Sequence, residues 1–375
     1  MLKRIGIVGG GQLGRMLTVP AKEMGFAVTV LDATPHAPAS QVGAEQILGA
    51  LTDGEKIHAL AKNTDILTFE IEHIDAQTLE SVAKQGKTVH PSAETLQTIK
   101  DKLTQKQFLN THQIPTAAFS DVQTAEDVID AAKAFGYPLV LKSRFGGYDG
   151  RGNAVIAKEK DIQLAMEKLG GGNLYIEQFV PFLKELAIMV ARSTSGDIKT
   201  YPLVETIHKN NILQYLLAPS SLTKTLQKKA ESFAISVMKH LGGAGVFGIE
   251  MFLTEKGEVL VNEIAPRVHN SGHYTIEACV TSQFEQHIRA ITGLPLGDTT
   301  MKVPAAVMIN ILGERKGDAN LEGLQDTLKI PGVSIHQYGK AETKIDRKMG
   351  HITVVGETIE ECLRRAKQAR KAIRI

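Results

Sequence analysis

Residues 2–98 alternate short apolar runs with amphipathic stretches, and this rhythm constrains the fold more than any other feature of the chain. Three of the runs are typical of parallel strands buried on both faces: 4–8, 27–31 and 65–69. Two other stretches carry apolar residues at helical spacing and predict crossover helices: 15–24 and 76–84. We therefore expect a doubly wound α/β domain at the N-terminus.

The rest of the chain does not keep this alternation. The pattern changes at His90-Pro91-Ser92, and from there to residue 298 strands and helices mix as in an α+β domain. After Val303 the sequence predicts several strands and a terminal helix at 359–373. With 375 residues, of which 43% are hydrophobic, the chain is long enough for two or three domains. We expect three domains: 1–98, 99–298 and 299–375.

Charge, hydropathy and cysteine content exclude several classes of protein. The chain has 43 Lys plus Arg against 41 Asp plus Glu, a net charge of +2, which disfavours binding to nucleic acid or a membrane through bulk charge. No apolar run approaches the ~18 residues of a membrane span, and the first residues lack a signal-peptide pattern. Cys279 and Cys362 have no metal-ligand spacing and are typical of thiols in a reducing cytoplasm.

The first glycine cluster, Gly9 to Gly14, satisfies the G-x-G-x-x-G pattern between a predicted strand and a predicted helix. Asp32 closes the second strand, where a ribose-binding acid stands in dinucleotide-binding domains. Three interpretations are open: a nicotinamide or flavin site, a site for another ligand's phosphate at the helix N-terminus, or a tight turn that needs glycine for packing. Six residues do not decide between them.

A second glycine-rich stretch, 146–152, follows a predicted strand that ends at Lys142. Glycines let a loop lie close over phosphates with its N–H groups directed at them, and Lys142 and Arg151 supply positive charge. The stretch lacks the G-x-x-x-x-G-K-[ST] pattern of a P-loop. A phosphate-binding loop and a plain hairpin turn are the alternatives, and the nearby cations favour the first.

Two predicted strands on either side of residues 254–258 form a hairpin with a carboxylate on each strand. If Lys256-Gly257 is a two-residue turn, the predicted pairs are Glu250 with Glu263 and Phe252 with Val261. Opposed carboxylates with Cβ atoms about 5 Å apart repel each other, and a divalent cation between them removes the repulsion. The hairpin therefore predicts a Mg²⁺ site, with two acids on a solvated sheet face as the alternative. Asn262 reaches that site only if a bulge interrupts its strand.

The segment after Glu263 concentrates polar side chains in a loop, at Arg267, His269, Asn270 and His273. His269 and His273 are four residues apart, but Asn-Ser-Gly between them disfavours the helix that a zinc-binding pair would need. Arg267 offers a fork of N–H donors that matches a planar carboxylate or bicarbonate. The segment is suited to holding a small anion, whereas His273 is expected to be a core residue.

Three cations, Lys340, Arg347 and Lys348, gather before a predicted strand at 351–355. They predict either a second phosphate site, for a substrate that must meet a nucleotide, or a solvated charged surface. The sequence alone leaves both interpretations open.

Taken together, these motifs resemble the ATP-grasp superfamily and, more narrowly, the N5-carboxyaminoimidazole ribonucleotide synthetase family. The resemblance covers essentially the whole chain and rests on GGGQLGRML at 9–17, DKLTQKQF at 101–108, GGYDGRG at 146–152, NEIAPRVHNSGH at 262–273, SQFEQHIRAITGLPLG at 282–297 and RKMGH at 347–351. It implies an α/β, ATP-grasp fold. The expected parts are an N-terminal Rossmann-like domain with a doubly wound parallel sheet, a central two-part α+β nucleotide-binding domain and a small β-rich C-terminal domain.

The resemblance also implies a reaction of purine (IMP) biosynthesis. ATP phosphorylates bicarbonate to carboxyphosphate, and the exocyclic amine of 5-aminoimidazole ribonucleotide is then carboxylated. The products are N5-carboxyaminoimidazole ribonucleotide, ADP and phosphate. Mg²⁺ is the implied cofactor, with Mn²⁺ as the alternative ion, and the implied assembly is a cytoplasmic homodimer.

Residue by residue, the resemblance assigns four sets of contacts. The ATP site is implied for Lys102, Lys142, Gly147, Tyr148, Asp149, Gly150, Arg151, Gly152, Asn153, Glu177, Gln178, Phe179, Val180, Glu185, His208, Asn262 and Glu263. Within it, the main chain of 177–180 reads the adenine edge and Glu185 binds the ribose hydroxyls. The ribonucleotide site is implied for Gln12, Leu13, Glu72, Tyr148, Asp149, Lys340 and Arg347, the last two at its phosphate. The implied Mg²⁺ ligands are Glu250 and Glu263. Bicarbonate and its phosphorylated form are implied to bind the catalytic residues Arg267, His269 and Asn270.

Some assignments keep alternatives. Position 102 is Lys where some relatives carry Arg, which leaves its contact to the nucleotide open. Either Glu70 or Glu72 meets the substrate, and we choose Glu72. The base that takes the proton from the amine is either His269 or the released phosphate. A nicotinamide-dependent oxidoreductase is a rival function that leaves the acid pair unexplained. A non-catalytic nucleotide sensor is a second rival, which the intact acids disfavour. An ATP-grasp ligase for another sugar phosphate is a third, which bicarbonate dependence separates.

Overall fold

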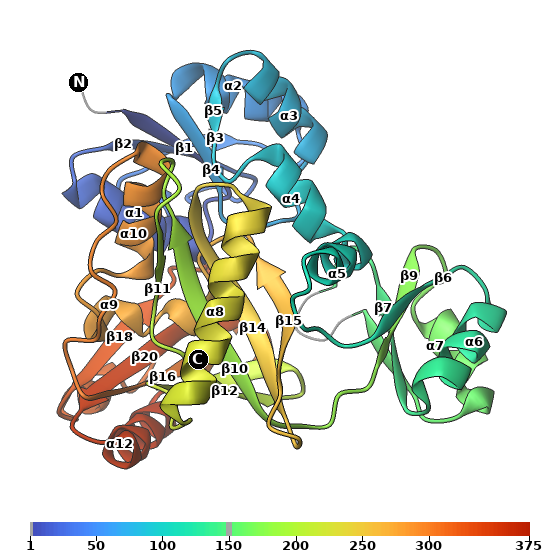
Figure 1. The fold of residues 1–375 in the computed structure, drawn as a ribbon. Helices are drawn as coiled ribbons and strands as arrows, with labels where there is room; N and C mark the ends of the chain where they lie inside the picture. Colours follow the sequence, from blue (N-terminus) through green and yellow to red (C-terminus); the bar gives the residue numbers. More distant parts are fainter. Residues whose placement is uncertain (1–2, 148–151) are drawn as a thin grey trace.

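The computed structural model describes residues 3–147 and 152–375, and its N-terminal part is a parallel sheet of five strands. The strand order is β3-β2-β1-β4-β5, with bounds Arg4–Val8 (β1), Ala27–Asp32 (β2), Glu45–Leu48 (β3), Ile66–Phe69 (β4) and Thr88–Val89 (β5). The helices of this part are α1 (Gln12–Glu23), α2 (Gly54–Asn63), α3 (Ala76–Lys84) and α4 (Ala93–Lys100). The predicted doubly wound domain is confirmed, in blue at the top of Figure 1.

Local sequence explains which of these elements could be predicted from the apolar pattern. β1 and β4 lie in the middle of the sheet and bury nearly all their side chains, so they are continuous apolar runs. The edge strands β3 and β5 are half-exposed or very short, and the apolar runs do not predict them. α1 begins at Gln12, earlier than the predicted Arg15, so the glycine cluster lies directly at its N-terminus.

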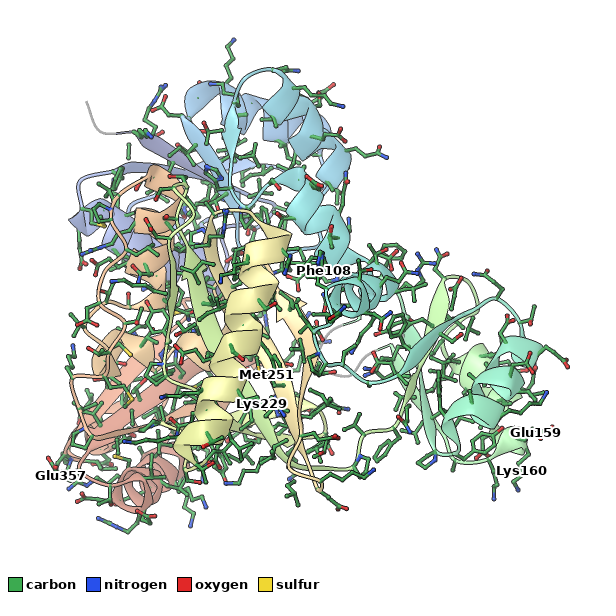
Figure 2. All side chains as sticks on the ribbon, in the orientation of Figure 1. Phe108, Glu159, Lys160, Lys229, Met251 and Glu357 are labelled. Carbon is green, nitrogen blue, oxygen red and sulfur yellow. The ribbon has the colours of Figure 1, made fainter. Side chains whose placement is uncertain are left out.

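Residues 119–178 form a small lobe with a hydrophobic core of its own. Its antiparallel sheet has the order β6-β9-β7-β8, with bounds Phe119–Val122 (β6), Leu139–Ser143 (β7), Asn153–Ile156 (β8) and Leu174–Gln178 (β9). Two helices pack on this core, α6 (Ala125–Phe135) and α7 (Ile162–Lys168). Figure 2 shows Glu159 and Lys160 at the outer end of the lobe, pointing away from the main body. The second glycine-rich stretch joins β7 to β8.

A large antiparallel sheet of nine strands fills the centre and the C-terminal part. Its order is β15-β14-β10-β12-β13-β16-β20-β18, with β11 paired to β10. The bounds are Phe182–Arg192 (β10), Ile198–Thr200 (β11), Val204–Lys209 (β12), Ile212–Ala218 (β13), Gly245–Thr254 (β14), Val259–Ala265 (β15), Ala305–Leu312 (β16), Val333–Gln337 (β18) and Lys348–Gly356 (β20). Because β13 pairs with β16, one sheet continues from the central into the C-terminal residues.

Strict alternation along β10 determines what covers each face of this sheet. Ala187 and Met189 share a core with α10 (Gln283–Thr292), which packs beside α1 of the N-terminal domain. Ile188 and Val190 share a core with α8 (Lys224–Leu241), the helix in yellow in front of the sheet in Figure 1. β10 is therefore buried on both sides, and its residues 186–191 are apolar at odd and even positions alike.

The remaining elements connect these parts. The sequence from 101 onward starts α5 (Lys102–Thr111), which lies between the N-terminal domain and the small lobe in Figure 1. The C-terminal helix α12 (Ile359–Ala372) packs on β16 and β20. Four short elements and three 3-10 helices complete the elements of the described residues. The short elements are α9 (Thr275–Ala278), β17 (Gly317–Asp318), α11 (Leu324–Leu328) and β19 (Glu342–Thr343), and the 3-10 helices are η1 (Ser40–Val42), η2 (Glu159–Asp161) and η3 (Asn270–Gly272). None of the helices in the described part of the chain is long and apolar enough to cross a membrane.

Candidate active site

The β14–β15 hairpin brings the two predicted metal-binding acids opposite each other. Glu250 pairs with Glu263, as predicted. Nearer the turn the register shifts by one residue, so Phe252 pairs with Leu260 and the predicted pairing of Phe252 with Val261 is wrong. The reason is the turn, which holds three residues between Thr254 and Glu258, with the amide of Thr254 donating to the carbonyl of Glu258 at 2.9 Å.

The register shift has a consequence for Asn262. With Val261 paired to Met251 and Glu263 paired to Glu250, Asn262 is the extra residue of a β-bulge. A bulge turns a side chain away from strict alternation, which is the condition under which Asn262 could join the acids. The bulge therefore removes the objection that alternation alone places Asn262 on the opposite face.

The opposed acids fit a hard divalent cation. Burial, and next the charge of Glu263, raise the pKa of Glu250 to about 7, so part of the shift is repulsion between the two carboxylates. Within residues 3–147 and 152–375 no group of three or more His, Cys, Asp or Glu side chains is arranged to hold a metal ion. Mg²⁺ commonly takes one or two carboxylates and completes its shell with phosphate oxygens and water, so the pair is a suitable site beside a nucleotide.

This repulsion leads to a prediction about stability. A carboxyl whose folded pKa lies above its unfolded value of 4.5 binds more protons in the folded state, so folded stability falls as pH rises from 4.5 through 7. Mg²⁺ between the acids should offset that loss, and it should raise the melting temperature by about 2 °C more at pH ~8.5 than at pH ~5.5. Calorimetry with and without Mg²⁺ measures the difference. A shift that does not depend on pH, or that persists in Glu263→Gln, would contradict the metal assignment.

Two lysines predicted for the nucleotide meet carboxylates beside this hairpin. Lys102 Nζ lies 2.6 Å from Glu263 Oε1, and Lys142 Nζ lies 3.0 Å from Glu177 Oε2. The N-terminus of α5 is held to β7 because the amide of Lys102 donates to the carbonyl of Arg144 at 2.9 Å. α5, β7, β9 and β15 thus converge on one cationic region in which every ammonium has an acidic partner.

The two residues assigned to the ribose end of the ATP site, Glu185 and His208, lie on one face of the large sheet. Glu185 on β10 and His208 on β12 share the alternation of Ala187 and Val204, and Glu185 Oε2 is 2.8 Å from His208 Nδ1. Burial opposes the charged imidazole, but the hydrogen bond and charge of Glu185 outweigh it and raise the pKa of His208. The two side chains therefore form one polar unit.

The stretch predicted to read the adenine edge is partly engaged by the small lobe. The amide of Gln178 donates to the carbonyl of Ala118 at 2.8 Å, and the amide of Phe179 donates to that of Pro138 at 3.3 Å. Phe179 exposes 39% of its surface, which leaves an apolar ring next to the polar backbone. Of the glycine-rich stretch, Gly147, Gly152 and Asn153 lie in the described part, while Tyr148, Asp149, Gly150 and Arg151 lie outside the described residues.

The N-terminal glycine cluster has internal carboxylates where a dinucleotide would need free donors. The amide of Gly11 donates to Glu70 Oε1 at 2.6 Å, the amide of Gly14 donates to Glu70 Oε2, and the amide of Gly10 donates to Asp32 Oδ2 at 3.0 Å. Burial raises the pKa of Glu70. A Cβ atom on Gly11 would lie only 2.7 Å from Glu70 Oε1, so the glycines of the fingerprint serve the close approach of a side chain.

This arrangement disfavours the nicotinamide interpretation. The acid that would bind a ribose, Asp32, also accepts from the amide of Thr34 at 2.8 Å, so both of its oxygens are engaged. The donors that would bind a pyrophosphate are taken by Glu70. Leu13, predicted at the ribonucleotide, has its side chain in the core between the sheet and α1.

The C-terminal cations reach this cluster from the other side. Lys340 Nζ donates to Gln12 Oε1 at 2.7 Å and to the carbonyl of Lys348 at 2.6 Å, joining sequence-distant predicted residues. Burial, and next the charge of Arg347, lower the pKa of Lys340 to about 7. Arg347 is more exposed, and its Nη1 donates to the carbonyl of Glu342 at 2.6 Å. Gln12, Lys340 and Arg347 are therefore brought together, and an anion here would restore the charge of Lys340.

The loop of the predicted bicarbonate site lies between these two regions. Arg267 is bidentate to Glu72, with Nε 2.5 Å from Oε2 and Nη2 3.0 Å from Oε1. Burial opposes ionisation of Glu72, but the charge of Arg267 outweighs it and lowers the pKa of Glu72 to about 2. Asn270 is buried, and neither its amide nitrogen nor its oxygen has a hydrogen-bond partner among the described residues. Such an amide fits a bound ligand because an unpaired buried polar group is costly.

The two histidines of the loop differ. His269 Nδ1 is 2.9 Å from Ser271 Oγ, and its Nε2 is 3.7 Å from Glu250 Oε1. Burial, and then the charge of Arg267, lower the pKa of His269 to about 3. His273 is fully buried, with Nδ1 3.0 Å from the amide nitrogen of Gln283, so its prediction as a core residue is confirmed.

Sequence reasoning missed Arg144 and Lys106, and it named Glu70 only as an alternative substrate contact. Glu70 fills the glycine cluster, Arg144 binds Asp101 at the start of α5 with Nε 3.0 Å from Oδ1, and Lys106 forms a buried ion pair with Glu177. Lys106 follows Lys102 by four residues, a spacing that puts both on one helix face. That spacing is the one signal that could have found Lys106. Glu70 and Arg144 carry no such local signal.

Comparisons with known proteins match every part of the chain. A model for the ATP-grasp domain matches residues 107–284, one for the ribonucleotide synthetase preATP-grasp domain matches 2–100, and one for the phosphoribosylaminoimidazole carboxylase C-terminal domain matches 306–365. The phosphoribosylaminoimidazole carboxylase of Schizosaccharomyces pombe is 45% identical over 368 residues. This match covers 96% of the chain but only 66% of the yeast protein, so the chain spans about two thirds of the length of that relative.

Two solved structures match along their whole length. The N5-carboxyaminoimidazole ribonucleotide synthetase of Thermotoga maritima is 48% identical, with a TM-score of 0.90, covering 100% of this chain and 99% of that one. The N5-carboxyaminoimidazole synthase of Aspergillus clavatus, in complex with ADP and 5-aminoimidazole ribonucleotide, is 36% identical with a TM-score of 0.91, covering 99% and 98%.

The fold, the cationic region and the acid hairpin together define an ATP-grasp ligase, and the model for that domain agrees. Within this class of ligases, the comparisons also show the family. Identity and coverage on this scale show that the chain belongs to the N5-carboxyaminoimidazole ribonucleotide synthetase family.

Proposed function

We propose that the chain uses ATP to carboxylate 5-aminoimidazole ribonucleotide with bicarbonate, giving N5-carboxyaminoimidazole ribonucleotide, ADP and phosphate in purine biosynthesis. The observation that carries this proposal is the position of Glu250. It opposes Glu263 on the metal-binding hairpin and lies 3.7 Å from His269 Nε2 of the anion loop. A phosphoryl group held at the first site is thereby next to an acceptor held at the second.

ATP would occupy the cationic region at which α5, β7, β9 and β15 converge. Lys102 and Lys142 would exchange their carboxylate partners for phosphate oxygens, and the polar unit of Glu185 and His208 would bind the ribose. Glu250 and Glu263, with Asn262 at the bulge, would hold Mg²⁺ or Mn²⁺. That ion would supply charge neutralisation for the transferred phosphoryl group. Residues 147–153 and 177–180 stay assigned to the nucleotide by the family resemblance.

Bicarbonate would bind at Arg267, His269 and Asn270. Glu72 holds the Nε edge of Arg267, and Nη1 donates one hydrogen to the carbonyl of Val268 at 3.2 Å. The second hydrogens of Nη1 and Nη2 would meet the anion, and Asn270 supplies an unpaired amide. The ribonucleotide phosphate would bind Lys340 and Arg347, with Gln12 nearby. We keep Glu72 as the ribonucleotide contact because its partner Arg267 links the two pockets and because Glu70 is committed to the glycine cluster.

The chemistry balances with these groups. A bicarbonate oxygen attacks the γ-phosphorus, the bond to ADP breaks, and carboxyphosphate forms. The ribonucleotide amine then attacks the carboxyl carbon, phosphate leaves with the bridging oxygen, and the nitrogen loses one proton. Because a pKa of about 3 makes His269 a weak base, we assign that proton to the released phosphate. Carboxyphosphate hydrolyses readily in water, so a buried loop is a suitable place to form it.

The domain division 1–98, 99–298 and 299–375 remains a proposal, as do a homodimer and a cytoplasmic location. In this division the first part supplies Gln12, the second the cationic region, and the third Lys340 and Arg347. The continuous sheet across residue 299 and the bond between Lys340 and Gln12 support a C-terminal part that completes the ribonucleotide pocket.

ADP release under defined substrates tests the function. We expect release with Mg²⁺ATP that requires bicarbonate and is stimulated by 5-aminoimidazole ribonucleotide. Stimulation without bicarbonate dependence would point to an ATP-grasp ligase with a different acid substrate. No stimulation would withdraw the named ribonucleotide. NADH absorbance followed in parallel should not change, since Glu70 and Asp32 occupy the dinucleotide donors.

A further inference from the structure

Lys106 is assigned no substrate contact in the proposed reaction, yet its ammonium lies buried in the cationic region. Its side chain exposes 3% of its surface, and Nζ lies 3.2 Å from Glu177 Oε1, whose side chain exposes 4%. Nζ also donates to Thr116 Oγ1 at 2.9 Å, and Thr116 donates in turn to the carbonyl of Val261 at 2.7 Å. A lysine is rarely buried unless it is paired, so its partner determines what it does.

That partner is shared with a predicted phosphate-binding residue. Glu177 Oε2 accepts from Lys142 Nζ at 3.0 Å, so one buried carboxylate lies between two ammonium groups. The pair of charges on Glu177 and Lys106 cancels, and the cluster as a whole keeps one positive charge. If Lys106 were absent, Glu177 and Lys142 would form a neutral pair, and phosphate would have to break it to bind.

We propose that Lys106 is a positioning residue that neutralises Glu177 and so leaves the charge of Lys142 available to the nucleotide phosphates. This inference rests on the proposed function, which places Lys142 at those phosphates. It explains why this lysine is buried against Glu177 although it lies on the same face of α5 as Lys102. Lys106 lies between the hairpin and the small lobe, where Thr116 fixes its ammonium against β15.

The test is a double-mutant cycle on nucleotide affinity. The dissociation constant of Mg²⁺ and a non-hydrolysable ATP analogue is measured by calorimetry for the wild type, Lys106→Met, Glu177→Gln and the double variant. Lys106→Met should weaken binding by about tenfold, the size of one lost charge-assisted contact. Adding Glu177→Gln should restore affinity to within about threefold of the wild type, because Lys142 no longer has a competing carboxylate.

Three controls separate this role from a structural one. Adenosine, which lacks phosphates, should bind Lys106→Met and the wild type equally. Lys106→Arg keeps the charge and should keep most of the affinity for the analogue. Lys160→Met makes the same substitution at an exposed lysine of the small lobe, far along the chain from α5, and should change nothing.

Each outcome decides. Equal affinity of Lys106→Met and the wild type, or a double variant weaker than Lys106→Met, would overturn the inference while leaving the proposed function intact. Failure of the wild type to bind the analogue would overturn the nucleotide site itself. If Lys106→Met does not fold, the double variant still tests the idea because it removes both charges of the buried pair, and an affinity more than about threefold below that of the wild type would overturn the inference.

Discussion

Replacing Glu263 with Gln should reduce Mg²⁺-dependent turnover by roughly 100- to 1000-fold while the protein stays folded. Glu263 is half of the opposed pair on β14 and β15, and removing its charge leaves Glu250 as the single anionic ligand. The fold should tolerate the change because one of two repelling carboxylates is removed. The substitution also breaks the ion pair with Lys102, so without Mg²⁺ the stability of the variant should stay within about 1 kcal/mol of the wild type.

Glu258→Gln is the matched control, because it makes the same substitution at an exposed residue beside the same turn. Its ADP release should equal that of the wild type at every Mg²⁺ concentration. Steady-state rates over a Mg²⁺ series and melting temperatures measure both effects. Unchanged turnover in Glu263→Gln would refute the metal site. Low turnover together with a large loss of stability would show a structural role instead.

Replacing both Lys340 and Arg347 with Ala should raise the KM for the ribonucleotide by about 100-fold or more, since each charge-assisted phosphate contact contributes about 1.5–3 kcal/mol. The KM for ATP should change little, because these side chains lie at the glycine cluster and not at the acid hairpin. Lys344→Ala removes an exposed lysine of the same segment and serves as control. An effect confined to ATP would contradict the assignment.

The pH dependence of the same constant gives an independent check. The free enzyme holds Lys340 with a pKa of about 7, so raising the pH above 7 removes the proton that a phosphate dianion needs on that ammonium. The wild-type KM for the ribonucleotide should therefore rise with pH above 7. The variant lacking Lys340 should lose this rise. A wild-type KM that stays constant between pH ~6.5 and ~8.5 would show that Lys340 does not contact the phosphate.

The sequence predicts the parts of this fold that repeat a simple physical pattern. β1 and β4 are buried on both faces and are predicted directly from their apolar runs, and α3 is bounded at Ala76 and Lys84 as its spacing predicts. β3 and β5 lie at sheet edges, where partial exposure or extreme shortness removes the pattern. Pairing across the large sheet depends on contacts between distant residues, which no local pattern carries.

The candidate site divides in the same way. Counting from a two-residue turn predicts the opposition of Glu250 and Glu263, but the turn holds three residues, and the pair is opposed because the bulge at Asn262 compensates for the extra residue. The count anticipates neither the turn nor the bulge. Glu70 follows β4, and its side chain accepts hydrogen bonds from the glycine cluster that follows β1. A fingerprint of glycines is the same whether a carboxylate or a phosphate lies above it, so only the fold distinguishes them.

The central claim is that ATP activates bicarbonate before the ribonucleotide amine attacks, and oxygen transfer tests it most directly. Bicarbonate labelled with ¹⁸O is incubated with Mg²⁺ATP and 5-aminoimidazole ribonucleotide for a time short enough to limit exchange with water, and the phosphate is analysed by mass spectrometry. We predict one ¹⁸O atom in each phosphate released, because the bridging oxygen of carboxyphosphate comes from bicarbonate. Phosphate that carries only oxygen from ATP and water would contradict the account.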